Sequence, residues 1–310
     1  KKLLQLQQDK EVLFLQGGAS QQFLMVPYNL LSPSQTAAYF DTGQWSHKAI
    51  AEAQNFGNVE VIASSKDANY AYIPKQWIAN EQLLRKTYAY VHFTTNNTIF
   101  GTQWSSNLVA TLLSQAQAPV VADMSSDIFS RQLDFDRMAL IYAGAQKNMG
   151  PAGTTLVVIN KGVLTKKDSF IPTVLNYAKQ IEAESMLNTP SVYAVYVSLL
   201  TLKWIEAQGL GSIEKQNNEK AQLLYKTIDD STVFSGTVAV EDRSQMNVCF
   251  KTADAETDAQ FLAFAEANDL QGLAGYRTVG GFRASIYNAM PLAGVQKLVA
   301  CMKQFESQYK

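Results

Sequence analysis

Short apolar runs alternate with amphipathic segments along the first part of the chain. Seven runs are rich in β-branched and aromatic residues, as is typical of buried strands; they are 11–15, 37–41, 59–64, 87–93, 120–123, 139–143 and 154–159. Between them, 20–31 and 45–55 have the pattern of helices. Strands that alternate with helices favour a largely parallel sheet with helices on both faces, so the pattern predicts an α/β fold.

The pattern changes after Pro190. Residues 191–207 place apolar side chains at helical spacing, and Gly209-Leu-Gly-Ser212 interrupts this spacing before a second helical segment that reaches Ile228. From about Val233 the elements become shorter and mixed, with a strand at 247–251 and helices at 255–268 and 294–307. This half of the pattern predicts a smaller α+β unit.

The length and composition agree with two domains. A chain of 310 residues that is 47% hydrophobic can bury two cores. We therefore expect a large domain over residues 1–208 and a small C-terminal domain over 209–310. The first ten residues have the composition of a helix end, without an initiator methionine or a helix-start signal, and run directly into the first strand. This beginning suggests a chain that starts inside a domain and lacks the N-terminal part of the large domain.

Charge and residue counts exclude several classes of function. A formal net charge of -1 offers no electrostatic footprint for nucleic acid or for an acidic membrane. Two histidines, His47 and His92, argue against a multi-histidine metal site. Cys249 and Cys301 are far apart, which favours free buried thiols in a reducing compartment over a disulfide. Without a membrane-spanning run or a signal-peptide pattern, we expect a cytoplasmic protein.

One lysine stands in a glycine-rich turn directly after an apolar strand, in Ile141-Tyr-Ala-Gly-Ala-Gln-Lys-Asn-Met-Gly-Pro-Ala-Gly153. An amine forms an imine with a carbonyl compound only when it is unprotonated, and partial burial at a strand end lowers the pKa of a lysine. Lys147 is therefore a candidate covalent nucleophile. A solvated turn residue is the structural alternative.

A carboxylate ends the preceding strand. Asp123 follows the apolar run 120–122, and strand ends on the carboxyl edge of a parallel sheet are where α/β enzymes place their sites. Pyridoxal phosphate chemistry requires such a pair: the lysine holds the cofactor aldehyde as a Schiff base, and the carboxylate keeps the pyridine nitrogen protonated. A turn or N-cap acid is the alternative for Asp123.

The first glycine turn, Gln16-Gly-Gly-Ala19, follows a strand and opens a helix. The free backbone N–H groups and the dipole of such a helix end form an anion site. An ordinary tight turn between strand and helix is the alternative.

Together these segments resemble one family, the phosphoserine aminotransferases, over nearly the whole chain. The lysine turn Tyr142–Gly153 and the segment Gly280–Met290 carry the most specific part of the resemblance. Shorter matching motifs occur in the same order, at 15–23, 40–45, 96–98, 122–126 and 187–190. The family implies a fold-type I pyridoxal phosphate enzyme with a mostly parallel seven-stranded sheet. It also implies transamination between O-phospho-L-serine with 2-oxoglutarate and 3-phosphohydroxypyruvate with L-glutamate, in serine biosynthesis and additionally in pyridoxine biosynthesis.

The resemblance assigns roles to individual residues. Lys147 and Asp123 would be catalytic, and Trp45 would stack on the pyridine ring. The other cofactor contacts would come from Ala19, Ser20, Thr98, Gln146, Asn188 and Thr189. In the family the last two reach the phosphate of the other subunit's cofactor, which implies a homodimer with shared active sites.

The resemblance is weaker at the distal end of the substrate. Arg283 would take the substrate α-carboxylate, with a structural salt bridge as the alternative, and Arg277 would help to bind the distal acidic group. Tyr276 stands where the family pattern has histidine, and the family's N-terminal Ser-His-Arg segment is absent. Two other functions stay open: another small-acid aminotransferase of the same fold, or a non-catalytic fragment that dimerises.

Overall fold

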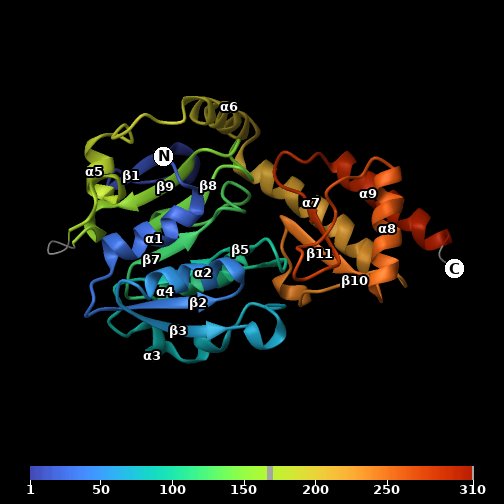
Figure 1. Cartoon of the computed structure of the whole chain (residues 1–310), viewed down its shortest axis with the longest axis horizontal. Coiled ribbons are helices and arrows are strands. Elements are labelled where there is room, and N and C mark those ends of the chain that lie inside the picture. Colours follow the sequence, from blue (N-terminus) through green and yellow to red (C-terminus); the bar gives the residue numbers. More distant parts are fainter. Residues whose placement is uncertain (166–169, 309–310) are drawn as a thin grey trace.

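A seven-stranded sheet forms the centre of the larger part of the molecule in the computed structural model, which describes residues 1–165 and 170–308 (Figure 1). The strand order is β1-β9-β8-β7-β4-β2-β3. Their bounds are β1 (Lys10–Leu15), β2 (Thr36–Asp41), β3 (Asn58–Ser64), β4 (Val91–Thr94), β7 (Val120–Asp123), β8 (Leu140–Gly144) and β9 (Thr155–Asn160). The α/β fold with a mostly parallel sheet is confirmed.

β9 alone runs against the other six strands of this sheet. It pairs antiparallel with both β1 and β8, whereas β8, β7, β4, β2 and β3 pair in parallel. The connection from β8 to β9 spans only 145–154, which is too short for the crossover that a parallel neighbour requires. As a result, the turn that contains Lys147 lies at the carboxyl end of β8, on the same edge as the end of β7.

Side chains of the central strands are buried on both faces of the sheet. In β8, Ile141 and Ala143 pack into one core, and Leu140 and Tyr142 pack into the other. The second core is closed by α1 (Gly18–Leu30) and α2 (Gln44–Ala53), and the first by α4 (Ser106–Gln115). Burial on both faces explains why these strands are almost continuously apolar.

The smaller part packs helices against a three-stranded antiparallel sheet of order β10-β11-β12. Its core is rich in phenylalanine, with Phe234, Phe261 and Phe305 in edge or tilted ring contacts. Its elements are α7 (Leu210–Asp229), β10 (Ser235–Gly236), β11 (Asn247–Lys251), α8 (Ala255–Ala267), β12 (Phe282–Ser285) and α9 (Leu292–Gln308). α7 connects the two parts, because its Ile213 joins a core of the larger part and its Leu224 joins the phenylalanine core (Figure 1).

The remaining elements are short, apart from one long apolar helix. They are α3 (Glu81–Leu84), α5 (Tyr177–Glu182), α6 (Val192–Gln208), a hairpin of β5 (Asn96–Asn97) and β6 (Thr102–Gln103), and the 3-10 helices Lys2–Leu4, Lys66–Ala68, Gln76–Ala79, Phe135–Arg137, Lys161–Val163, Thr173–Leu175 and Val240–Asp242. None of the helices formed by residues 1–165 and 170–308 has the length and apolar character that crossing a bilayer requires.

Most expected elements are confirmed within a few residues, and two expectations were wrong. The expected strand 87–93 begins only at Val91, because the residues before it make only single hydrogen bonds to β2. The Ala89 N–H donates to the Thr36 carbonyl, and the Tyr90 carbonyl accepts the N–H of Ala38. Residues 1–10 do not form a helix end. They contain a single 3-10 turn that stops where Gln5 adopts a left-handed conformation, with φ 51°. Cys249 and Cys301 are both buried and unpaired.

Candidate active site

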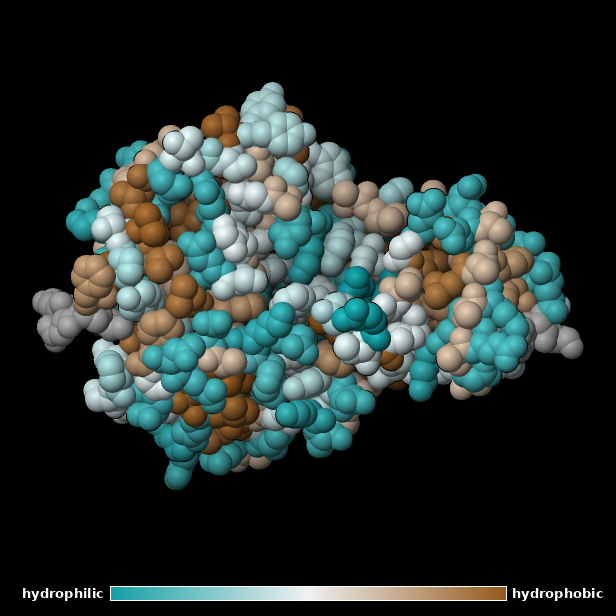
Figure 2. Space-filling model, in the orientation of Figure 1, coloured by the Kyte–Doolittle hydropathy of each residue, from teal (hydrophilic) through white to brown (hydrophobic). Residues whose placement is uncertain are grey.

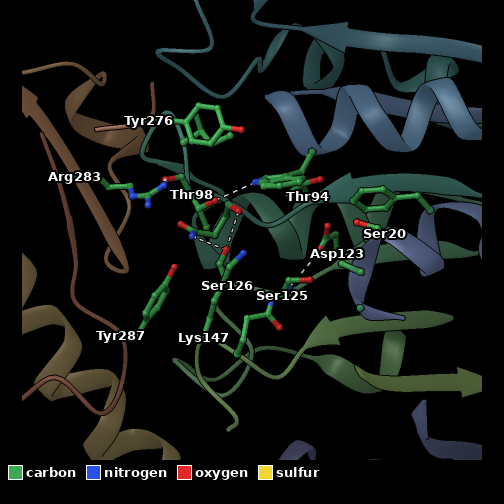
Figure 3. Close-up of a pocket in the computed structure, with 17 residues that line it drawn as sticks. Ser20, Thr94, Thr98, Asp123, Ser125, Ser126, Lys147, Tyr276, Arg283 and Tyr287 are labelled. Carbon is green, nitrogen blue, oxygen red and sulfur yellow. Dashed lines mark hydrogen bonds between the residues drawn. The ribbon is translucent and has the colours of Figure 1, made fainter. Parts of the chain in front are cut away.

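A cavity of about 360 Å³ lies at the carboxyl edge of the large sheet, where the smaller part faces it (Figure 3). Its wall combines strand ends, the first turn of α1, the turn after β8 and residues of the smaller part. Among the described residues that line it, Asp123 is the only carboxylate and Lys147 the only amine. The cavity therefore contains one carboxylate and one amine, and the guanidinium group of Arg283 is its other basic lining group.

Lys147 is held in a tight turn that α6 covers. Ala145 organises the turn: its carbonyl accepts hydrogen bonds from the N–H groups of Met149 and Gly150, at 3.0 and 2.9 Å. A Cβ at Gly150 would lie 2.6 Å from Ser198 Oγ on α6, so a residue without a side chain is needed for this close packing. The glycines of the motif therefore allow α6 to press on the turn that carries the lysine.

The environment of Lys147 favours the neutral amine. Burial lowers the pKa of its ammonium group, and nearby Arg283 lowers the pKa further, while the negative charges of Asp123 and Asp127 oppose both effects. A lysine of lowered pKa is the form that attacks a carbonyl carbon.

Asp123 is a buried acid at the end of β7. One of its carboxylate oxygens accepts the backbone N–H of Ser125 at 2.9 Å. Burial raises the pKa of Asp123, and the hydrogen bonds from Ser125 together with the charge of Lys147 offset part of that rise. A carboxylate in such a place gains strongly from a cationic N–H partner.

A neutral aromatic layer supports this acid from within the sheet. Tyr142 is the parallel register partner of Asp123, and its hydroxyl lies 2.8 Å from His92 Nε2. Burial lowers the pKa of His92 to about 3, so the ring stays uncharged, and it stacks on Tyr39 at 4.7 Å. None of the side chains of Tyr142, His92 and Tyr39 therefore provides a positive charge for Asp123.

Hydrogen bonds connect Trp45, Thr98 and Arg283 in the wall of the cavity, where Figure 3 labels Thr98 and Arg283. The indole Nε1–H of Trp45 donates to Thr98 Oγ1 at 3.0 Å, and Arg283 Nη1 donates to the Thr98 carbonyl at 3.2 Å. The Trp45 ring centroid lies 5.9 Å from Lys147 Nζ. A flat apolar face and a guanidinium group therefore flank the space next to the amine.

The first turn of α1 has the features of an anion site. Its N-cap residue Gly17, with φ 87°, provides no side chain to cap the free N–H groups of the turn. Ala19, Ser20 and the side chain of Gln146 line the same end of the cavity. A phosphate group placed there would meet unpaired donors and the positive end of the helix dipole.

The structure brings together eight of the eleven residues that the sequence pointed to. They are Ala19, Ser20, Trp45, Thr98, Asp123, Gln146, Lys147 and Arg283. Asn188 and Thr189 are exposed and lie outside the cavity of this single chain, where the Thr189 carbonyl accepts a hydrogen bond from Gln16 Nε2 at 2.7 Å. Arg277 is also exposed and outside the cavity, whereas its neighbour Tyr276 lines it.

Several cavity residues were not predicted as site residues. Thr94 ends β4 directly beside Asp123, and Ser125 and Ser126 follow β7. Tyr287 enters from the smaller part, and its hydroxyl oxygen lies 3.0 Å from Asn247 Nδ2. The alternation of side chains in β4 could have pointed to Thr94, because this residue shares a face of the strand with His92. For Tyr287, the only indication in the sequence was its position four residues after Arg283.

The donor set fits pyridoxal phosphate. An amine of lowered pKa suits its aldehyde, a buried carboxylate suits its ring nitrogen, a tryptophan face suits its ring, and an uncapped helix end suits its phosphate. Arg283 remains for a further anion, and its planar fork matches a carboxylate.

Known proteins with similar sequences and structures share this arrangement of elements. The Aminotransferase class-V family model matches residues 1–298. The chain is 54% identical to the phosphoserine aminotransferase of Flavobacterium johnsoniae over 299 residues, which cover 96% of this chain and 81% of that protein. It is 50% identical to that of Parabacteroides distasonis, over 100% of this chain and 84% of that protein.

Two solved structures extend the similarity to the fold. The phosphoserine aminotransferase from Bacillus circulans subsp. alkalophilus superimposes with a TM-score of 0.92 at 40% identity, over 100% of this chain and 84% of that one. The PLP-bound phosphoserine aminotransferase from Trichomonas vaginalis gives a TM-score of 0.87 at 33% identity, over 97% of this chain and 84% of that one.

Proposed function

The chain belongs to the class-V aminotransferase family as a phosphoserine aminotransferase, and from this membership we propose how its residues carry out the reaction. It is a pyridoxal phosphate-dependent enzyme. The reaction is the transfer of an amino group between O-phospho-L-serine with 2-oxoglutarate and 3-phosphohydroxypyruvate with L-glutamate. One observation carries the assignment of roles: a lysine of lowered pKa and a buried carboxylate share one cavity with an uncapped helix end.

Lys147 and Asp123 act on protons at two ends of the cofactor site. When bound, pyridoxal phosphate supplies the electron sink for the substrate carbanion. Lys147 Nζ would hold the cofactor through its aldehyde group, and as a free amine it would accept the proton from the substrate Cα and return it during transamination. Asp123 holds the proton on the ring nitrogen, because a buried carboxylate stabilises a cationic N–H group.

The other cavity residues orient the two ligands. Trp45 covers one face of the cofactor ring and Thr98 offers its hydroxyl, which already accepts the indole N–H. The backbone N–H groups of Ala19 and Ser20, with the Gln146 side chain, hold the cofactor phosphate. Arg283 binds the α-carboxylate of the substrate.

Distal recognition is assigned to the loop before β12. Tyr276 lines the cavity, and the next residue, Arg277, is exposed and is not part of the lining. Arg277 supplies the positive charge for the distal acidic group, while Tyr276 can offer only one neutral hydrogen bond.

A homodimer with shared active sites is supported by an apolar surface on α6. Five large apolar residues of this helix are between 46% and 75% exposed, namely Val192, Tyr193, Tyr196, Leu199 and Leu200. Figure 2 shows brown, hydrophobic residues at the upper edge of the larger part, where Figure 1 places α6. An exposed patch of this kind marks an interaction site, and a second copy that covers it would bring Asn188 and Thr189 towards the neighbouring cofactor phosphate.

We also propose the domain boundary at 208/209. Gly209, with φ 79°, separates α6 from α7, and beyond the first turns of α7 the buried residues belong to the phenylalanine core. The large domain is then 1–208 and the small domain 209–310. A cytoplasmic location is proposed with them, because two buried thiols that remain unpaired suit a reducing compartment.

The test is cofactor attachment followed by peptide mapping. Purified chain with pyridoxal phosphate should give a visible imine absorption band, and borohydride should fix the cofactor to Lys147. Lys48 provides a matched control, because its Nζ lies 5.0 Å from the same Trp45 ring but the residue is exposed and does not line the cavity. Lys147→Ala should lose the band and the turnover of phosphoserine, and Lys48→Ala should keep both. An adduct on a lysine other than Lys147 would exclude Lys147 from the mechanism. A separate assay with a panel of amino donors would identify a substrate other than phosphoserine.

A further inference from the structure

A buried lysine of the smaller part has no acidic partner. Lys220, on α7, is 1% exposed, and among the described residues no carboxylate lies within ion-pair distance of it. Its ammonium group instead donates to three backbone carbonyls: Ile286 at 3.0 Å, Tyr287 at 2.8 Å and Met290 at 3.0 Å. All three N–H donors of the ammonium group are therefore used within one turn of the chain, residues 286–290.

This turn carries the substrate side of the cavity. It directly follows β12, where Arg283 lies, and it contains Tyr287, which also lines the cavity (Figure 3). The hydroxyl of Tyr287 is held by Asn247 Nδ2 at 3.0 Å, and its carbonyl by Lys220. Tyr287 is therefore fixed at both ends, and one of the two anchors is the buried lysine.

The same turn is tied to the residue next to Lys147. The backbone N–H of Asn288 donates to Asn148 Oδ1 at 3.0 Å, and Asn288 Nδ2 donates to the Phe129 carbonyl at 3.0 Å. Asn217, one helical turn before Lys220, donates to Asn288 Oδ1 at 2.8 Å and to the Ser130 carbonyl at 3.0 Å. Hydrogen bonds therefore connect α7 through the 286–290 turn to Asn148, which lies in the lysine loop, the connection 145–154 that carries Lys147.

The burial of Lys220 costs free energy of folding, so the contacts of its ammonium group point to a role other than stability. An ammonium group without a counter-charge loses its hydration, and three neutral carbonyls replace that hydration only in part. Burial lowers the pKa of Lys220 to about 8, so the group still keeps its proton near neutrality. A methionine of similar length would fill the same space without this loss.

We infer that Lys220 is a positioning residue for transamination, which fixes Arg283 and Tyr287 relative to Lys147 by holding the 286–290 turn against the lysine loop. The inference rests on the proposed function of the cavity. It concerns the substrate half of the site: the cofactor contacts at Ala19, Ser20 and Asp123 come from the large sheet and its helices and do not depend on this turn. Lys220 should therefore act on substrate binding and leave cofactor binding intact.

A second buried lysine provides a matched control. Lys10, in β1, is 3% exposed and donates to the Met138 carbonyl at 2.9 Å. Met138 precedes β8, at the end of the strand opposite to the Lys147 turn. Lys10→Met and Lys220→Met therefore make the same chemical change in a buried lysine, but only the second touches the turn beside the cavity.

The experiment compares these two variants with the parent enzyme, each loaded with pyridoxal phosphate. Lys220→Met should raise KM for phosphoserine and for L-glutamate, with a loss in kcat/KM of about tenfold to a hundredfold, since small misplacements of a binding group have effects of this size. Its affinity for pyridoxal phosphate should stay within about twofold of the parent, as expected for a change that leaves the cofactor contacts in place. Lys10→Met should leave both KM values and the affinity for pyridoxal phosphate at the parental level.

Three results would overturn the inference: a parental KM in Lys220→Met, an equal rise of KM in Lys10→Met, or a loss of cofactor affinity as large as the loss of substrate affinity. If Lys220→Met does not fold, Asn288→Ala tests the same connection from the other side, and a parental KM in that variant also overturns it. If the parent turns over no phosphoserine, the proposed substrate is wrong. The positioning role is then judged on amino transfer from L-glutamate to the bound cofactor, followed by absorbance.

Discussion

Replacement of Asp123 by asparagine should separate cofactor binding from turnover. The two side chains have the same shape, and an amide oxygen can still accept the Ser125 N–H that Asp123 accepts at 2.9 Å. Only the negative charge is lost. Because the charge of Asp123 works against the lowered pKa of Lys147, its removal lowers that pKa further and leaves the amine at least as ready to react with the cofactor aldehyde.

The loss of turnover follows from the burial of Asp123. An exposed ion pair contributes about 1 kcal/mol or less, but this carboxylate is 4% exposed, and a buried partner of a charged group contributes roughly 2 to 5 kcal/mol. At 1.36 kcal/mol for each factor of ten, Asp123→Asn should lower kcat/KM between about thirtyfold and a few thousandfold. An amide cannot hold the proton on the ring nitrogen, so the change falls on the proton transfers at Cα and C4′.

The assay measures phosphoserine turnover and cofactor affinity on the same preparation. Asp242→Asn provides a control for the removal of a buried carboxylate: Asp242 is 3% exposed, accepts the N–H of Ile73 at 2.9 Å and pairs with Lys75 at 2.8 Å, away from the cavity. It should lose stability and keep its turnover per bound cofactor. Turnover by Asp123→Asn within about threefold of the parent would refute the role of the charge, since even the lower bound predicts thirtyfold.

Three further predictions concern pH, substrate and assembly. His92 has a folded pKa of about 3, below its unfolded value of 6.5, so its contribution to stability is complete above pH 6.5 and is lost as the pH falls towards 3. In urea titrations between pH 7 and 4, the parent should therefore lose roughly 3 kcal/mol more unfolding free energy than His92→Gln. Equal losses in the two proteins would contradict this. Tyr276→His should raise kcat/KM for phosphoserine by up to about tenfold at pH 6 and by less at pH 8, because only the protonated ring adds a charge-assisted hydrogen bond to the distal phosphate. The same gain at both pH values would argue against a charge effect. Tyr196→Asp, a charge on the exposed surface of α6, should give monomers in sedimentation and weaken cofactor binding, and the parent's cofactor affinity should fall on dilution; tight binding by a monomer would contradict shared sites.

The central sheet and the reacting pair were predictable because their signals are local. Strands buried on both faces are nearly continuous apolar runs, and the carboxyl end of each run marks the edge where Asp123 and Lys147 meet. The glycines beside Lys147 were also visible in the sequence, although their reason, the close approach of α6 to Gly150, was not.

The parts that could not be predicted depend on contacts between distant segments. The reversal of β9 follows from the short connection after β8, but apolar runs carry no mark of strand direction. Lys220 has the sequence context of an ordinary helical surface residue, and only the packing of the 286–290 turn over α7 buries it. Asn188 and Thr189 are exposed and lie outside the cavity of the single chain, and no local pattern in the sequence indicated this position.

The position of β1 at the edge of the sheet affects the order in which the chain can fold during its synthesis. Lys10 pairs with Asn160, and within the described parts of the chain β1 has β9 as its single neighbour in the sheet. At translation rates of about 5 to 20 residues per second, the roughly 150 residues between them mean that β1 waits about 8 to 30 seconds for its partner. During that interval an apolar strand stays unpaired, a state that favours aggregation. The helix that follows β1 and forms the anion site is thus anchored late, so we expect the cofactor pocket to be complete only after the whole large sheet has emerged from the ribosome.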